Sequence, residues 1–328
     1  MKPRAVGLTS FLFLTVTFGA CNRDTVTGLP DIAARSAAGP KKLKDAIAIF
    51  TRQFSPVDGG LAVMTVDGSD RRPLPGGDLG FEPSISPDGR RIAFSRNTDI
   101  GVTSIYVMNV DGTGTTEVAR GLVFNPGPVW SPEGCRIAYR AGFDQQVSPW
   151  IAIVNADGTE PRRITPEPDP NEFAYYEGPT WSPDGSKLAF TKNSVLHVIN
   201  VDGTGLTALP NEDLAITPSW SPDGTRIAYI SLDPVGEIHL RNPDGSNLVR
   251  VTTSSSENGI FDFWPRWAPD SRRLVSAHIA GDQIGTQTIN IDGTNPVNLT
   301  PAGVLDFMPD WSPRSSDVEF EGSGKCAF

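Results

Sequence analysis

Short apolar runs separated by turn-forming residues recur along most of the chain. Arg91–Phe94 and Ile105–Met108 are such runs, and a weaker one follows at Thr116–Ala119. Their β-branched and aromatic content favours strands, and the Gly, Pro and Asp residues between them favour tight connections. The pattern therefore predicts many short strands joined by hairpins.

The connections repeat with a fixed chemistry. A seven-residue motif, Pro-x-Trp-Ser-Pro-Asp-Gly in its most regular form, occurs six times with small variations. The copies are Pro83–Gly89, Pro128–Gly134, Pro179–Gly185, Pro218–Gly224, Pro265–Ser271 and Pro309–Ser315. Ser-Pro-Asp-Gly suits a type I turn, since Ser accepts a hydrogen bond, Pro presets φ and Gly closes the turn.

A second turn signal, an Asp-Gly step after an apolar run, also occurs six times. The steps begin at Asp67, Asp111, Asp157, Asp202, Asp244 and Asp292, so their mean spacing is 45 residues. Four short antiparallel strands in about 45 residues are typical of one propeller blade. The sequence therefore predicts an all-β, six-bladed β-propeller of four-stranded antiparallel blades.

The two ends of the repeat array are expected to close the ring. The last motif copy, around Trp311, would supply the leading strand that the first blade lacks, which removes exposed sheet edges. Ala46–Phe50 and Val318–Phe320 both resemble the second strand of that blade. Because Arg314-Ser315 replaces Asp-Gly in the last copy, the N-terminal segment is favoured.

The motif tryptophans are expected to pack between blades. They are Trp130, Trp181, Trp220, Trp267 and Trp311. A residue type that every later blade repeats is best explained by a demand of the fold, and large aromatic side chains dominate such packing.

In these motifs the chain resembles the TolB-type six-bladed propellers, and the resemblance covers Lys44 to about Glu321. Deviations at Ile85, Glu133, Ala268 and Ser271 look like drift in a structural repeat. TolB proteins also have an N-terminal α/β domain, which the short segment between Cys21 and the first strand leaves no room for. For the family, the resemblance implies a role in an envelope complex with a lipoprotein partner.

The first twenty residues resemble a secretory signal. Lys2 and Arg4 precede an apolar stretch, Ala5–Phe18, that is too short to span a bilayer. The sequence Phe-Gly-Ala-Cys ending at Cys21 resembles a bacterial lipoprotein box, although Phe stands where Leu is usual. Ordinary cleavage after Ala20 fits less well, because it prefers a small residue at the Phe position. Cys21 is therefore expected to carry lipid.

These features divide the chain into a lipoprotein signal peptide (1–20), a flexible tether (21–43) and the propeller (44–328). The expected location is the bacterial envelope, facing the periplasm, with the outer membrane favoured by Asn22. The lipid would be the only membrane attachment. Cys135 and Cys326 could pair in an oxidising compartment, but their positions in different repeats favour free thiols.

Composition narrows the function. The 28 Lys and Arg against 38 Asp and Glu give a net charge of −10, which argues against nucleic acid as a partner. Three His and three Cys leave little material for a zinc site or an imidazole-based centre. No cofactor or metal is expected. The 33 Gly and 29 Pro agree with a turn-rich fold.

The candidate binding surface is the loop face at the mouth of the central channel. Loops that vary on a rigid scaffold commonly bind, and the segments before each motif proline differ between blades. The candidates are Phe81, Glu82, Phe124, Tyr175, Tyr176, Glu177, Asp262, Phe263, Trp264, Asp306 and Phe307. Loops between second and third strands would add Asp58, Asp99, Asp144, Asp233 and Asp282. This predicts an aromatic floor with an acidic rim for a protein or peptide segment; the alternative is that the aromatics merely plug the channel.

A catalytic role is not expected. The sequence has no Gly-x-Ser-x-Gly, His-Glu-x-x-His or Cys-x-x-Cys pattern. His197 and His239 occupy equivalent strand positions, and His278 alone lies near the candidate face. The prediction is a non-catalytic, monomeric binding propeller. The alternatives are an enzyme, a carbohydrate- or small-ligand-binding propeller using the same face, and a structural subunit of an envelope complex.

Overall fold

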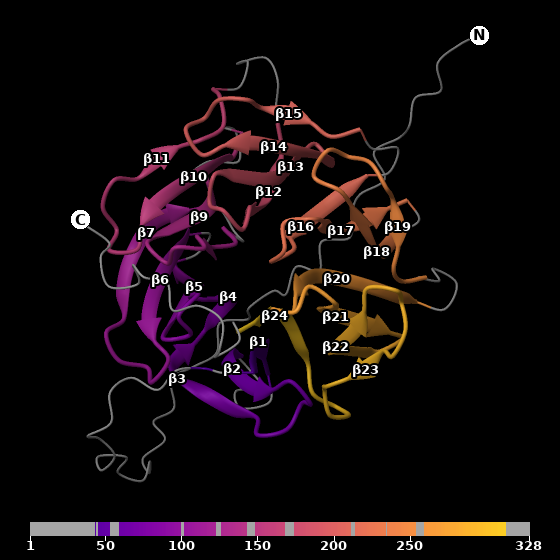
Figure 1. Cartoon of the computed structure of the whole chain (residues 1–328). Coiled ribbons are helices and arrows are strands. Elements are labelled where there is room, and N and C mark those ends of the chain that lie inside the picture. The colour runs from indigo at the N-terminus through magenta and orange to yellow at the C-terminus, as the bar shows by residue number, and fades with distance from the viewer. Residues whose placement is uncertain are drawn as a thin grey trace. The chain divides into compact units, whose positions relative to one another are not determined.

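Six four-stranded antiparallel sheets surround a common axis in the computed structural model (Figure 1). The structure describes residues 43, 45–52, 59–99, 102–122, 126–142, 148–167, 174–210, 214–233, 235–253 and 259–312. These residues belong to one compact unit, residues 40–328. Within them every regular element is a strand, so the predicted all-β class and the six blades are confirmed.

The blades are numbered here in chain order, and the strands of each are given from the axis outwards. Blade 1 contains β24 (Asp306–Trp311), β1 (Ala46–Thr51), β2 (Gly60–Thr65) and β3 (Arg72–Asp78). Blade 2 contains β4 (Gly80–Ile85), β5 (Arg91–Asp99), β6 (Val102–Asn109) and β7 (Thr116–Leu122). Blade 3 contains β8 (Val129–Trp130), β9 (Arg136–Ala141), β10 (Trp150–Asn155) and β11 (Arg162–Arg163).

The remaining blades repeat the order. Blade 4 contains β12 (Tyr176–Trp181), β13 (Lys187–Lys192), β14 (Val195–Asn200) and β15 (Thr207–Ala208). Blade 5 contains β16 (Ala215–Trp220), β17 (Ile227–Leu232), β18 (Val235–Arg241) and β19 (Val249–Arg250). Blade 6 contains β20 (Ile260–Trp267), β21 (Arg273–Ala280), β22 (Gln283–Asn290) and β23 (Val297–Asn298).

Blade 1 closes the ring with both ends of the repeat array. β1 lies between β24 and β2, with Ile47 opposite Trp311 on one side and opposite Met64 on the other. The backbone N–H of Ala46 also donates to Ser312 Oγ at 2.8 Å. Both closure predictions are therefore confirmed, since the last motif copy supplies the first strand and the N-terminal segment supplies the second. Val318–Phe320 lies outside the described residues.

The two repeated turns form as their residues predict. In the first, the N–H of Gly89 donates to the carbonyl of Ser86 at 2.8 Å, and the Ser86 hydroxyl donates to Asp88 at 2.6 Å. In the Asp-Gly turn, Gly112 has φ 86°, and Thr113 donates from both its N–H and its hydroxyl to Asp111. These bonds lower the pKa of Asp111, because they stabilise its ionised form.

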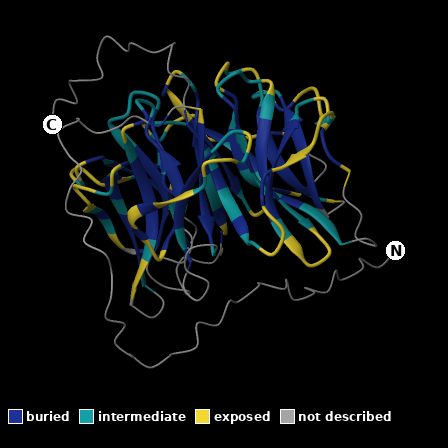
Figure 2. Ribbon diagram, turned by 90° about the horizontal axis from the view of Figure 1, so that it is seen from below, coloured by how far each residue is buried: buried dark blue, intermediate teal, exposed yellow. Residues whose placement is uncertain are grey.

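The tryptophans join neighbouring blades, as predicted. The indole N–H donates to a carbonyl in the preceding blade's innermost strand: from Trp130 to Ser84, from Trp181 to Val129 and from Trp267 to Ser219, at 2.9–3.1 Å. Trp220 instead donates to Gly224 O within its own turn. Figure 2 shows the consequence, a continuous buried band through the blades with exposed residues at the turns and loops.

One expectation is corrected. Cys135 is disulfide-bonded, so the prediction that this thiol stays free is wrong. Cys21 and Cys326 lie outside the described residues, as does the lipidation site. Within the described ranges, the structure contains no apolar helix of membrane-spanning length.

The channel mouth as a candidate binding site

Every innermost strand is kinked immediately before the motif proline. The preceding residue adopts a left-handed conformation in all six blades, with φ between 49° and 55°. These residues are Glu82, Gly127, Gly178, Thr217, Trp264 and Met308. The pairing between first and second strands slips by a bulge at this point in blades 1, 2, 4, 5 and 6. Bulges of this kind redirect side chains and commonly lie near functional sites.

The kink changes the interpretation of the candidate segments. The sequence predicted inter-blade loops before each proline, but most of these residues are the first half of an innermost strand. Phe81, Glu177 and Phe307 are examples. Periodicity did not reveal this, because the bulge breaks the alternation that marks a strand. The six strands therefore hold the variable residues on a rigid frame around the axis.

Aromatic side chains gather where blades 6 and 1 meet. The rings of Trp264 and Phe307 stack with centroids 6.2 Å apart, and Phe263 lies 5.8 Å from Trp264. Phe50 of β1 packs on the other side of Phe307 at 4.7 Å. Phe263, Trp264 and Phe307 are half-buried. The structure therefore brings three predicted residues into one cluster, called here the aromatic cluster together with Phe50.

Charged side chains gather on blades 2 to 4. Glu82 accepts hydrogen bonds from the Ser95 hydroxyl at 2.8 Å and from the Gly127 N–H at 2.9 Å. Burial raises the pKa of Glu82, although these bonds and the nearby Arg140 and Arg266 oppose the shift. The position thus favours a carboxyl group that takes up a proton more readily than an exposed glutamate.

Arg140 connects this region to blade 4. Its guanidinium donates to the Tyr175 hydroxyl at 3.1 Å and lies 5.5 Å from the Tyr175 ring centroid. Tyr175 is exposed at the surface, whereas Glu177 is half-buried and burial raises its pKa. Arg140, Tyr175 and Glu177 therefore combine an aromatic surface with hydrogen-bonding groups.

A second charged pair lies deeper along the innermost strands. Arg266 lies 3.9 Å from Asp310, which accepts the Ile85 N–H at 2.7 Å. Burial raises the pKa of Asp310 to about 6. Arg266 in blade 6 also acts electrostatically on Glu82 in blade 2, across blade 1. These groups consequently share the space along the axis.

Sequence reasoning missed Arg140, Arg266 and Asp310. The sequence did contain a pattern that could have identified Arg266 and Asp310. Both directly follow the motif proline, and the other four blades have Ser84, Val129, Thr180 and Ser219 at this position. A charged residue at a position that is small or uncharged elsewhere departs from what the repeat requires. Arg140 gave no such signal within its strand.

Four predicted site residues are mostly or fully buried. Tyr176 is 2% exposed and packs against Phe190 in the core, and Phe81 is 8% exposed. Asp306 is fully buried and pairs with Arg71 at 2.5 Å. Asp262 is 2% exposed. The carboxylates of Asp262 and Asp306 are thus used inside the fold and do not lie on an exposed rim. Phe124 lies outside the described residues.

Asp262 holds a histidine in blade 6. It accepts hydrogen bonds from His278 Nδ1 at 2.9 Å and from Gln287 Nε2 at 2.6 Å. A carboxylate-bound histidine is one part of a general-base arrangement. Among the described residues, His278 Nδ1 lies within hydrogen-bonding distance of Asp262 and Gln287, and these contacts orient its ring.

The other histidines serve packing. His197 stacks on Phe190, and burial lowers its pKa. His239 is buried against Tyr229, with Nε2 3.4 Å from the Glu237 carboxylate. No group of three or more metal-ligating side chains occurs within the described part of the chain.

The predicted loop acids are placed in part. Asp233 and Asp282 follow the second strands of blades 5 and 6 and are exposed. Asp99 ends β5. Asp58 and Asp144 lie outside the described residues. The exposed acids thus lie at the same end of the blades as the aromatic cluster.

The architecture defines a six-bladed β-propeller with a kinked, chemically varied inner ring. A family profile described as the TolB beta propeller domain matches residues 53–198. The chain is thus similar to TolB propellers over this segment of its repeats, and it shares their fold.

Individual proteins show similarity over parts of the chain. A Protein TolB homolog from Chlorobium luteolum is 30% identical over 134 residues, which cover 39% of this chain and 28% of that protein. A Dipeptidyl-peptidase 5 from Porphyromonas endodontalis is 26% identical over 113 residues, 33% of this chain and 15% of that protein. The matched segments thus span less than a third of either relative. The structure of TolB from Acinetobacter baumannii superposes with a TM-score of 0.69 at 19% identity, over 82% of this chain and 67% of that one.

Proposed function

We propose that this protein is a non-catalytic binding propeller of the bacterial envelope that holds a protein or peptide segment at its channel mouth. The observation that carries the proposal is the inner ring, where the residue at one recurring kink varies: it is Gly in blades 3 and 4 and Glu, Thr, Trp or Met in the other four. Residues that the fold requires recur in most blades, whereas the kink position holds five residue types in six blades. Variation confined to one ring of a rigid scaffold supports binding.

The chemistry of the ring favours a segment of mixed character. The aromatic cluster offers large, half-buried surfaces of the kind that anchor interfaces. Arg140, Tyr175 and Glu177 lie on the other side and offer hydrogen bonds and charge. An apolar side chain of the partner would pack on Trp264 and Phe307, and its polar backbone or side chains would meet the charged region.

Attachment to the membrane through lipid on Cys21 forms part of the proposal. The tether 21–43 would let the propeller face the periplasm from an anchored end, with the outer membrane as the favoured site. A Cys21→Ser variant should then leave the membrane fraction. If that variant sediments with membranes to the same extent as the unmodified protein, lipid anchoring at Cys21 is ruled out.

Site-specific crosslinking in the native envelope tests the binding face. A photo-crosslinking residue at position 307 should give a discrete adduct, and the same residue at position 297 should not, since Val297 is exposed on outer strand β23. The adduct should disappear when Trp264 is replaced by glycine, which accepts the left-handed backbone. A matched control, Leu248→Ala, removes an exposed apolar side chain next to β19, the outermost strand of blade 5. Equal adducts at both positions, or an adduct that survives Trp264→Gly, would refute the proposed face.

A further inference from the structure

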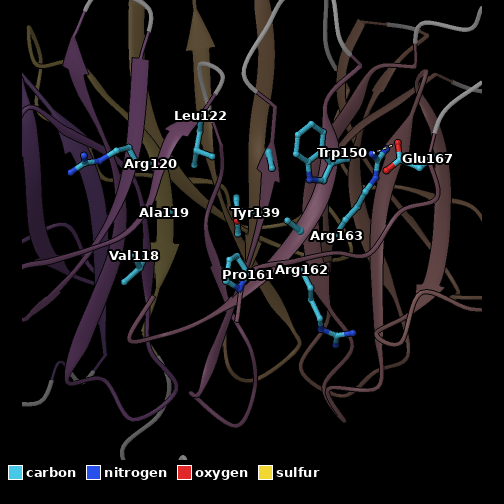
Figure 3. A pocket seen from close by; sticks show the side chains of 12 residues that line it. Val118, Ala119, Arg120, Leu122, Tyr139, Trp150, Pro161, Arg162, Arg163 and Glu167 are labelled. Carbon is cyan, nitrogen blue, oxygen red and sulfur yellow. Dashed lines mark ion pairs between the residues drawn. The ribbon is translucent and has the colours of Figure 1, made fainter. Parts of the chain in front are cut away.

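A groove opens on the side of the propeller, between the outer strands of blades 2 and 3. It encloses about 590 Å³ and is lined by β7 on one side and by β9, β10 and β11 on the other (Figure 3). The volume falls within the range of ligand-binding pockets. Apolar side chains from β7, including Val118 and Leu122, face Trp150 and Tyr139 across it.

Trp150 departs from the repeat. It lies opposite Ala141, the last residue of the second strand of its blade. At the equivalent position the other blades hold Gly60, Ser104, Val195, Glu237 and Gly285. The fold thus does not require an aromatic residue there, in contrast to the motif tryptophans. A half-buried tryptophan without a structural counterpart in five blades is a candidate anchor for a ligand.

The groove is open because the strands around it differ in length. β7 has seven residues, whereas β11 has only two, Arg162–Arg163. β7 is the outermost strand of its blade, and seven extended residues span roughly 23 Å. An extended segment of similar length can therefore lie along β7 and reach Trp150.

Positive side chains line this groove in a protein of net charge −10. Arg120, Arg162 and Arg163 are among its lining residues, against one acid, Glu167. The Arg163 guanidinium also lies 5.0 Å from the Trp150 ring centroid. The groove is thus aromatic, apolar and cationic together.

The arginines have internal partners that a ligand can replace. Arg120 pairs with Glu117 at 2.8 Å and Arg163 with Glu167 at 2.9 Å. Arg163 also donates to the carbonyls of Thr165 and Pro166 at 2.9 Å, which hold its guanidinium beside Trp150. One member of each pair is at least 80% exposed, and ion pairs of this kind contribute little because water screens them. A carboxylate brought in by a bound segment can therefore compete for the same guanidinium groups.

We infer that this groove binds an extended acidic segment of a partner protein. An apolar side chain of the segment packs on Trp150 between the two blades, and its carboxylates pair with Arg120, Arg162 and Arg163. The site is separate from the channel mouth, so it does not depend on the function proposed above. It would allow the propeller to hold a partner by its side while the mouth stays available.

Selection from a displayed library of random twelve-residue peptides against the full-length protein tests the inference. The expected result is enrichment of peptides with Asp or Glu around an aromatic or large aliphatic residue. Their affinity should fall at least tenfold in Trp150→Ser, which installs the blade 2 residue, and in the surface variant Arg120→Glu/Arg162→Glu. The charge-reversed variant covers the case in which Trp150→Ser disturbs folding. The affinity should also fall as salt increases.

The channel-mouth variant Trp264→Gly is the matched control, and it should bind the selected peptides as tightly as the unmodified protein. Failure of the library to yield acidic peptides, or binding that survives both groove variants, overturns the inference. Peptides lost only in Trp264→Gly would instead support the channel mouth and refute the groove.

Discussion

Breaking the buried ion pair between Arg71 and Asp306 should strongly destabilise the protein. Asp306 is fully buried, the Arg71 side chain is 8% exposed, and the two groups meet at 2.5 Å. Asp306 also accepts the Thr300 hydroxyl at 2.7 Å. Asp306→Ala leaves a buried guanidinium without this carboxylate, and removing one partner of a buried pair costs about 3–5 kcal/mol. We expect a loss of that size in the free energy of unfolding, measured with urea.

A half-exposed pair provides the control. Arg136 and Glu133 lie 2.6 Å apart with side chains 28% and 37% exposed, so Glu133→Ala should cost no more than about 1 kcal/mol. Replacing both Arg71 and Asp306 with Met and Leu should be less harmful than the sum of the single changes, because it leaves no buried charge. A cost below about 1 kcal/mol for Asp306→Ala would refute the structural role assigned to this carboxylate.

Three further predictions concern backbone strain, titration and the disulfide. Thr217→Gly should match or exceed the stability of the unmodified protein by up to about 1 kcal/mol, because a β-branched residue at φ 49° is strained; a loss above that size in thermal unfolding would contradict it. The folded-state pKa of Asp310, about 6, lies above its unfolded value, so ionising it opposes folding. As the pH rises from 4 to 7, the free energy of unfolding of Asp310→Asn should therefore increase by on the order of 1–3 kcal/mol relative to that of the unmodified protein. A difference between the two proteins that does not change with pH would contradict this. Cys135 should resist alkylation until a reductant is added, and labelling in the oxidised native protein would show that no disulfide forms there.

The fold could be predicted from the sequence because the same turn-forming residues recur in six repeats. Pro, Asp and Gly at fixed spacing force two hairpin turns per 45 residues, and four short strands between such turns form a blade whatever its neighbours are. The recurrence of Trp at one position also predicted inter-blade packing. The number of motif copies also predicted ring closure: the copy around Trp311 supplies the first strand of the blade whose second strand is Ala46–Phe50.

The tertiary structure decided which variable residues face the axis. Asp262 and Phe263 are adjacent in sequence and were equivalent candidates, but alternate residues of a strand point to opposite faces. Asp262 is therefore buried and hydrogen-bonded to His278, whereas Phe263 lies in the aromatic cluster. The kink before each proline could not be read from a pattern, because a bulge depends on the register with the neighbouring strand.

The groove between blades 2 and 3 also could not be predicted from the sequence, because residues of both blades form it. Trp150 and Arg120 are thirty residues apart, and they line one groove because β7 and β10 lie across a blade boundary. The sequence by itself determined the repeat, the number of blades and the closure, since these arise from short-range turns and periodicity. Only the assembled ring decided which charges are buried, which aromatics cluster and where the surface opens, because burial and contact depend on residues distant in the chain.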